Sequence, residues 1–181
     1  MFARAPILGL LAAGALSFHT DGSPSFRLAA TGAVNLAVTS QEATYGLVPK
    51  EENQPRIIAI SLGAKRGDAS LTLYTQGPEL PQPGRYPVRS SWTNERDGGR
   101  MFHACFIAGT PEHPVGGFHG ESGWVTITRV DGRRMSGEFE LSARGVLAAN
   151  VDNENQWVTV RGGFVAEGDS TVATIRQVSI R

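Results

Sequence analysis

Residues 123–143 read GWVTITRVDGRRMSGEFELSA and carry the strongest structural signal in the chain. On each side of the Asp131–Gly132 pair, apolar or small residues occupy every second position, which is the period of a β-strand with one buried face. Asp-Gly suits the tight two-residue turn of a hairpin, because both turn positions need a positive φ. The stretch therefore predicts a β-hairpin with these inward residues: Val125, Ile127, Met135, Gly137, Phe139 and Leu141.

The same alternation recurs along the rest of the chain and predicts further strands. It covers 26–38 as one long strand, and it is found again in 56–64, 69–75 and 156–167. The proline-rich stretch 80–88 can form only a connection or an edge strand, since proline cannot donate to a strand ladder. About eight to ten short strands, with no convincing helical stripe after the N-terminal segment, indicate an all-β protein. Their uneven spacing favours an antiparallel β-sandwich.

The composition is that of one folded domain with balanced charge. Of the 181 residues, 40% are hydrophobic, which is enough apolar material for a core. The 22 glycines and 10 prolines are typical of a protein built from strands and turns. Lys+Arg and Asp+Glu number 17 each, so the formal net charge is zero. This balance argues against binding to nucleic acid or to an anionic membrane surface.

The N-terminal segment has the layout of a secretory signal peptide. A positive charge at Arg4 precedes an apolar stretch from Ala5 to Phe18 that ends in small residues. The stretch is shorter than the roughly 20 apolar residues that a membrane-spanning helix needs. We therefore expect residues 1–17 to be a signal peptide and 18–181 to be a single secreted or periplasmic domain without a transmembrane span. The alternative is membrane association through an uncleaved N-terminal segment.

The C-terminal third resembles a known class of sequences. The pattern Gly-x-Val-x-Ile in 123–127 is followed by Met-x-Gly-x-Phe-x-Leu in 135–141 and Val-x-Val-x-Gly-x-Phe in 158–164. This succession is similar to uncharacterised secreted bacterial β-sandwich proteins, in which a G-x-V-x-I strand leads into V-x-G-x-F strands. The resemblance implies a bacterial envelope protein, and it carries over no site residues.

Residues 101–121, MFHACFIAGTPEHPVGGFHGE, hold three of the four histidines of the chain, its only cysteine and two glutamates. His103 and Cys105 lie two apart on a predicted strand, so both point to the same face. Zinc sites gain their specificity from tight pairs such as Cys-x-x-Cys, and this stretch has none. We therefore expect a buried cysteine, a satisfied strand histidine and exposed loop histidines. The alternative is a metal site on four residues: His103, Cys105, His113 and His119.

We expect binding through a sheet edge or through loops such as 92–100 and 109–120. An exposed aromatic ring at the edge of a sandwich can stack on a sugar, and histidines beside a carboxylate can bind a divalent metal. The candidate binding residues are Trp92, His113, His119 and Glu121.

The segment GESG at 120–123 is similar to the Gly-Asp-Ser-Gly motif of chymotrypsin-like proteases, with Ser122 at the position of their nucleophile. In that family the base histidine lies well before the serine, in an earlier set of strands. The histidines of this chain lie close to Ser122, apart from His19, which precedes the first predicted strand. The motif therefore does not predict a protease.

The segment NVDNENQW at 150–157 alternates oxygen-bearing side chains, as calcium loops do. In such a loop the sixth position is glycine and the twelfth is glutamate, but here they are Asn155 and Arg161. We therefore expect an ordinary polar turn between two strands, with a calcium site as the alternative.

Strands and turns account for most of the chain, and the polar clusters lack the spacing of known catalytic motifs. The sequence therefore favours a binding or structural module that is not an enzyme and needs no cofactor. Such a module could be a peripheral subunit of an envelope or membrane protein assembly. The alternative is a small-ligand module that binds a sugar or a divalent metal through loop residues.

Overall fold

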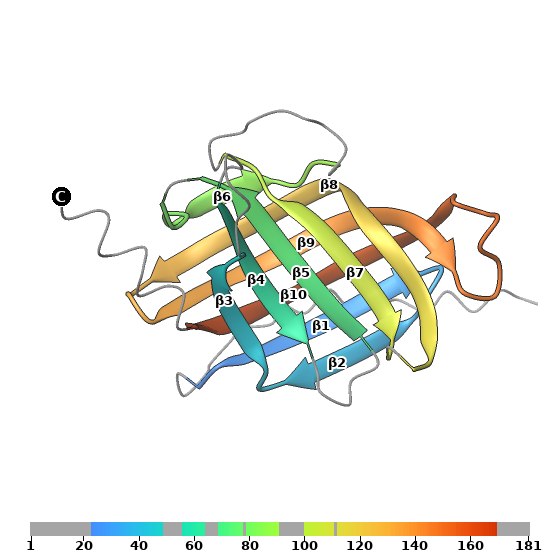
Figure 1. Cartoon of the computed structure of the whole chain (residues 1–181), viewed down its shortest axis with the longest axis horizontal. Helices are drawn as coiled ribbons and strands as arrows, with labels where there is room; N and C mark the ends of the chain where they lie inside the picture. The colour runs from blue at the N-terminus through green and yellow to red at the C-terminus, as the bar shows by residue number, and fades with distance from the viewer. Residues whose placement is uncertain are drawn as a thin grey trace, which may run out of the picture.

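A computed structural model describes residues 23–48, 56–63, 69–77, 79–90, 100–110 and 112–169. The predicted signal peptide, Trp92 and the residues after 169 lie outside these ranges. Within them the fold is all-β, as predicted, and ten strands form one hydrogen-bonded sheet (Figure 1). The strands are β1 (Ser25–Gly32), β2 (Leu36–Ser40), β3 (Ala43–Leu47), β4 (Ile57–Gly63), β5 (Ala69–Gln76), β6 (Gly84–Pro87), β7 (His103–Gly109), β8 (Pro114–Val130), β9 (Arg134–Leu147) and β10 (Gln156–Gly168).

The sheet folds over on itself into the two layers of a sandwich. In Figure 1, β3, β4, β5 and β7 lie in front and cross the direction of β1, β2, β9 and β10 behind them. Neighbouring strands run antiparallel, apart from a short parallel contact of β3 with β10 at Glu167 and Gly168. The side chains between the layers form the core, and the outer faces of the strands are accessible to solvent to varying degrees.

Strands β8 and β10 each belong to both layers. One edge of β8 pairs with β9, while its other edge pairs first with β7 and then with β6. In the same way, β10 pairs with β9 on one edge and with β1 and then β3 on the other. The register of β8 shifts between Gly120 and Ser122, and Gly123 has a φ of 123°. A β-bulge of this kind bends a strand, which lets β8 pass from one layer to the other.

The predicted hairpin of residues 123–143 is confirmed as the end of β8 and most of β9. The turn itself is at Gly132 and Arg133, one residue later than predicted: Gly132 has a φ of 73°, and the flanking Asp131 N–H donates to the Arg134 carbonyl at 2.9 Å. All six residues that alternation placed inward, Gly137 among them, are buried. The proline-rich stretch 80–88 also behaves as predicted, because β6 lies at the end of the strand order beside β8.

Residues 26–38 form two strands instead of the one long strand that their alternation predicted. Strand β1 ends at Gly32, whose φ of 122° suits glycine, and β2 begins at Leu36. The Asn35 side chain closes the turn, since its Oδ1 accepts from the Gly32 N–H at 3.4 Å and its Nδ2 donates to the Gly32 carbonyl at 3.2 Å. The alternation therefore continues through a hairpin.

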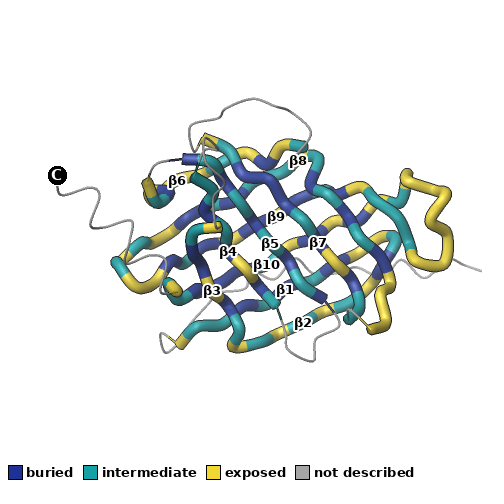
Figure 2. Tube along the Cα trace, viewed as in Figure 1, coloured by how far each residue is buried: buried dark blue, intermediate teal, exposed yellow. Residues whose placement is uncertain are grey.

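The core is rich in aromatic side chains, and buried positions alternate with accessible ones along the strands (Figure 2). The rings of Phe106 on β7 and Phe118 on β8 are fully buried register partners, with centroids 5.9 Å apart. Near β6, the rings of Tyr86 and Phe102 meet edge to face at 5.5 Å. Such contacts tie β7, β8 and β6 into one core and make the sheet beneath the outer face rigid.

Candidate functional site on the outer face of β8 and β9

Most of the loop predicted at 109–120 is instead the beginning of β8. Strand β7 ends at Gly109 and β8 begins at Pro114, so a short turn joins them. Proline is tolerated as the first residue of a strand because its missing N–H costs no ladder bond there. The histidine at the turn, His113, is exposed as expected, whereas His119 lies half-buried within β8.

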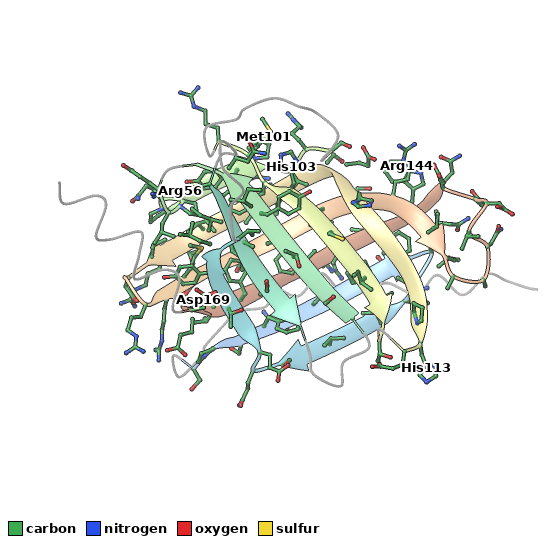
Figure 3. All side chains as sticks on the ribbon, viewed as in Figure 1. Arg56, Met101, His103, His113, Arg144 and Asp169 are labelled. Carbon is green, nitrogen blue, oxygen red and sulfur yellow. The ribbon has the colours of Figure 1, made fainter. Side chains whose placement is uncertain are left out.

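The structure does not bring His113 and His119 together. The extended strand between them spans roughly 20 Å, whereas a zinc–nitrogen bond is about 2 Å long. Figure 3 shows His113 at the turn, well away from Arg144, which pairs in register with His119. Across the described ranges, no three His, Cys, Asp or Glu side chains are placed so that they could hold a metal ion.

His103 lies in a structural environment at the start of β7. Its side chain is buried, its Nδ1 lies 3.0 Å from the Arg89 carbonyl oxygen, and its ring centroid is 5.3 Å from that of Tyr74. Because a carbonyl oxygen only accepts, this hydrogen bond places the proton on Nδ1. This hydrogen bond thus links the backbone at Arg89 to the start of β7.

Four side chains from four neighbouring strands form a row on the outer face of the sheet. Cys105 of β7 pairs in register with His119 of β8, which in turn pairs with Arg144 of β9. Trp157 of β10 is the register partner of Arg144 on its other side. Cβ atoms of such pairs lie about 5 Å apart, so neighbours in the row are within reach of one another. We call these four residues the outer row: Cys105, His119, Arg144 and Trp157.

Glu121 reaches the outer row through the bulge in β8. It is the extra residue between Gly120 and Ser122, each of which has a register partner on β9. The Glu121 Oε1 lies 3.4 Å from the Arg144 Nε, and the two side chains are 23% and 46% exposed. An ion pair this accessible contributes no more than about 1 kcal/mol to stability. Its main effect is to hold a donor and an acceptor side by side at the surface.

A hollow lies over β8 and β9 beside the outer row. Its lining includes Gly117, His119, Glu121, Arg144, Gly145 and Glu154, and we call it the β8–β9 hollow. Glu154 comes from the turn between β9 and β10, where the Asn155 N–H donates to the Asn153 Oδ1 at 3.1 Å. This turn is the polar connection that the sequence predicted.

The two glycines of the β8–β9 hollow are there for different reasons. A Cβ on Gly145 would collide with the carbonyl oxygen of Gly117 and would lie 2.7 Å from the Phe118 Cα. Glycine at 145 therefore lets β8 and β9 approach closely. A Cβ on Gly117 would meet no atom within 4 Å, and its φ is not positive. The missing side chain at Gly117 leaves open space above the strand.

We expect Cys105 to be alkylated slowly at neutral pH. The thiol is half-buried on β7, and burial raises its pKa above the ordinary value, so less of the reactive thiolate is present. The measurement is the rate of iodoacetamide labelling, followed by mass spectrometry from neutral to alkaline pH. The folded chain should react more slowly than the urea-unfolded chain, and its rate should level off at a higher pH. Identical pH profiles would contradict the raised pKa.

Trp157 is the exposed tryptophan of the described chain, at 49%, whereas the sequence favoured Trp92, which lies outside the described residues. Trp124 is half-buried, and the guanidinium carbon of Arg85 lies 4.6 Å from its ring centroid. Sequence reasoning singled out neither Trp157 nor Arg144 as a site residue. Alternation places both on outer faces, but they are brought together by the register of β9 against β10, which no local motif specifies.

No family model, curated protein or solved structure matches the chain. Among the residues that the structure describes, no helix combines the length and apolar character needed to cross a membrane. The described residues also line a second, larger hollow that includes Glu42, Ser61 and Gly63. Of the two, the β8–β9 hollow contains residues that the sequence predicted as site residues, His119 and Glu121.

Proposed function

We propose that the chain is a secreted or periplasmic binding module, not an enzyme, that holds its ligand or partner at the β8–β9 hollow. The observation that carries this proposal is the hollow itself. Charged side chains of Glu121, Arg144 and Glu154 surround a space that the missing side chain of Gly117 leaves open. A concave site with a few convergent polar groups is the usual form of a ligand site.

The rigidity of the surroundings supports a binding role. His119 and Arg144 project from strands that are paired on both edges, and Phe118 packs in the core directly beneath them. Side chains on such strands lose little freedom when a ligand arrives, which favours affinity. A site of this kind suits a module that recognises a surface component, and a peripheral subunit of an envelope assembly is one such role.

The chemistry of the outer row supports binding over catalysis. Cys105 and His119 are register partners, as a nucleophile and its base could be. A catalytic cysteine, however, needs a lowered pKa, and burial raises the pKa of Cys105. The pair therefore lacks the electrostatic setting of an activated thiol.

Native mass spectrometry of the protein from the envelope fraction of its own host, prepared without chelators, tests the proposal. We expect a ligand or partner retained by the wild-type chain and lost in Gly117→Leu, because the leucine side chain would fill the hollow. The matched control is Gly84→Leu on β6, which lies outside the β8–β9 hollow and where a Cβ would come no closer than 3.7 Å, to the Tyr86 Cε2.

Three outcomes would count against the proposal. A bare chain in both wild type and Gly117→Leu would remove the binding role. A partner kept by Gly117→Leu would place the binding surface elsewhere. A metal ion lost in His119→Ala would favour the alternative of a divalent metal site.

A further inference from the structure

We infer that the ligand of the β8–β9 hollow is a neutral glycan, which stacks one sugar ring on Trp157 and places the next in the hollow. This inference rests on the proposed function and names its ligand class. It is argued from three features of the outer face: an exposed indole, a mixed set of donors and acceptors, and a glycine without a structural reason.

The indole of Trp157 provides an exposed aromatic platform on the outer face of the sheet. It is 49% exposed although tryptophan is a residue type that is usually well buried, and it stands next to Arg144 across the β9–β10 register. The C–H faces of a sugar ring are apolar and flat enough to cover such a ring, while the sugar hydroxyls point sideways. An indole at this place therefore fits a ligand with one apolar face and a polar rim.

The hollow on the other side of Arg144 provides the groups that hydroxyls need. Arg144 donates and Glu121 accepts, and their ion pair at 3.4 Å holds them side by side. A sugar hydroxyl both donates and accepts, so adjacent hydroxyls can bridge such a pair without breaking it. From His119 to Trp157 the row spans two strand spacings, roughly 10 Å. A glycan that covers this length must contain more than one sugar ring.

The charges around the hollow favour a neutral ligand. Glu121 and Glu154 bring two carboxylates and Arg144 brings one guanidinium, so an acidic sugar or a phosphate would meet a net negative surface. A cationic peptide would be attracted by the carboxylates, but it would compete with Arg144 for Glu121. A neutral glycan uses both members of the pair, which makes it the occupant that the geometry favours.

The position of Gly117 supports a ligand of some bulk. Glycine inside a strand weakens it, and it often marks a place where a ligand or another backbone approaches closely. Within the described ranges no backbone approaches Gly117 on that side, since a Cβ there would meet nothing within 4 Å. The space above Gly117 is therefore available to a sugar ring.

Isothermal titration calorimetry of the purified full chain tests the inference with cellohexaose, laminarihexaose, mannohexaose and chitohexaose as probes. We expect at least one of them to bind with a dissociation constant below about 1 mM. Trp157→Ala should weaken that binding by about tenfold or more, as removal of an aromatic anchor does. Gly117→Leu should abolish it, and Arg144→Met should weaken it.

Gly84→Leu and Trp124→Phe are the matched controls, because neither residue belongs to the outer row or lines the β8–β9 hollow, and both variants should bind as wild type does. Circular dichroism should show that every variant is folded. Absence of binding to all four probes would overturn the inference, as would preferred binding of a hyaluronan oligosaccharide or of tetralysine. If no glycan binds while native mass spectrometry still shows a partner lost in Gly117→Leu, the glycan is wrong and the proposed function stands.

Discussion

Replacement of Phe118 by alanine should lower the free energy of unfolding by about 3–5 kcal/mol, as for other buried phenylalanines. The Phe118 side chain is fully buried on β8, and its ring lies 5.9 Å from that of Phe106 on the neighbouring strand. Truncation would leave a cavity where β7 and β8 meet, and rigid strands on both edges of β8 would limit the collapse that could fill it. The loss is large against a typical total stability of about 5–15 kcal/mol.

Urea unfolding followed by circular dichroism measures this loss as a lower midpoint with an unchanged slope. The matched control is Val115→Ala on the same strand, because Val115 is 49% exposed. Its free energy of unfolding should differ from that of the wild type by no more than about 0.5 kcal/mol. Equal midpoints for Phe118→Ala and wild type would show that β8 does not pack against β7 as described.

The fold was predictable from the sequence wherever a short stretch of residues is enough to specify a strand or a turn. The Asp131–Gly132 pair and the alternating side chains of residues 123–143 specify a hairpin by themselves, and the structure has it. The pattern failed at Gly32, where positive φ turns the chain without interrupting the alternation. It failed again after Pro114, because glycines and histidines hide the alternation of the first half of β8.

The candidate site was predictable only in part, because it depends on contacts between distant segments. His119 and Glu121 were candidate binding residues, but as parts of a loop that also carried His113. The bulge at Glu121 changes which residues face outward along β8, and the sequence around Glu121 contains no motif that predicts a bulge. Arg144 becomes a partner of Glu121 through the register of β8 against β9. Such pairings follow from packing of the whole sheet, so the sequence of each segment alone does not reveal them.

Alanine at the two glycines of the β8–β9 hollow should have opposite effects on stability. Gly145→Ala should destabilise the chain by about 3 kcal/mol, because its Cβ would collide with the Gly117 carbonyl oxygen and push β8 away from β9. Gly117→Ala should instead stabilise the chain by about 0.5–1 kcal/mol. Its Cβ has open space, and alanine restricts the unfolded chain more than glycine does.

Urea unfolding of both variants beside wild type measures the two effects, and a destabilised Gly117→Ala would contradict the open space described above that residue. The comparison also separates two reasons for keeping a glycine. At Gly145 the fold itself requires the absence of a side chain, since the backbone of β8 occupies its place. At Gly117 the fold would be more stable with a side chain. Glycine at this position therefore lowers stability, and the loss is compensated only if a ligand occupies the space above it. A stabilised Gly117→Ala would therefore be the result expected if that space serves binding.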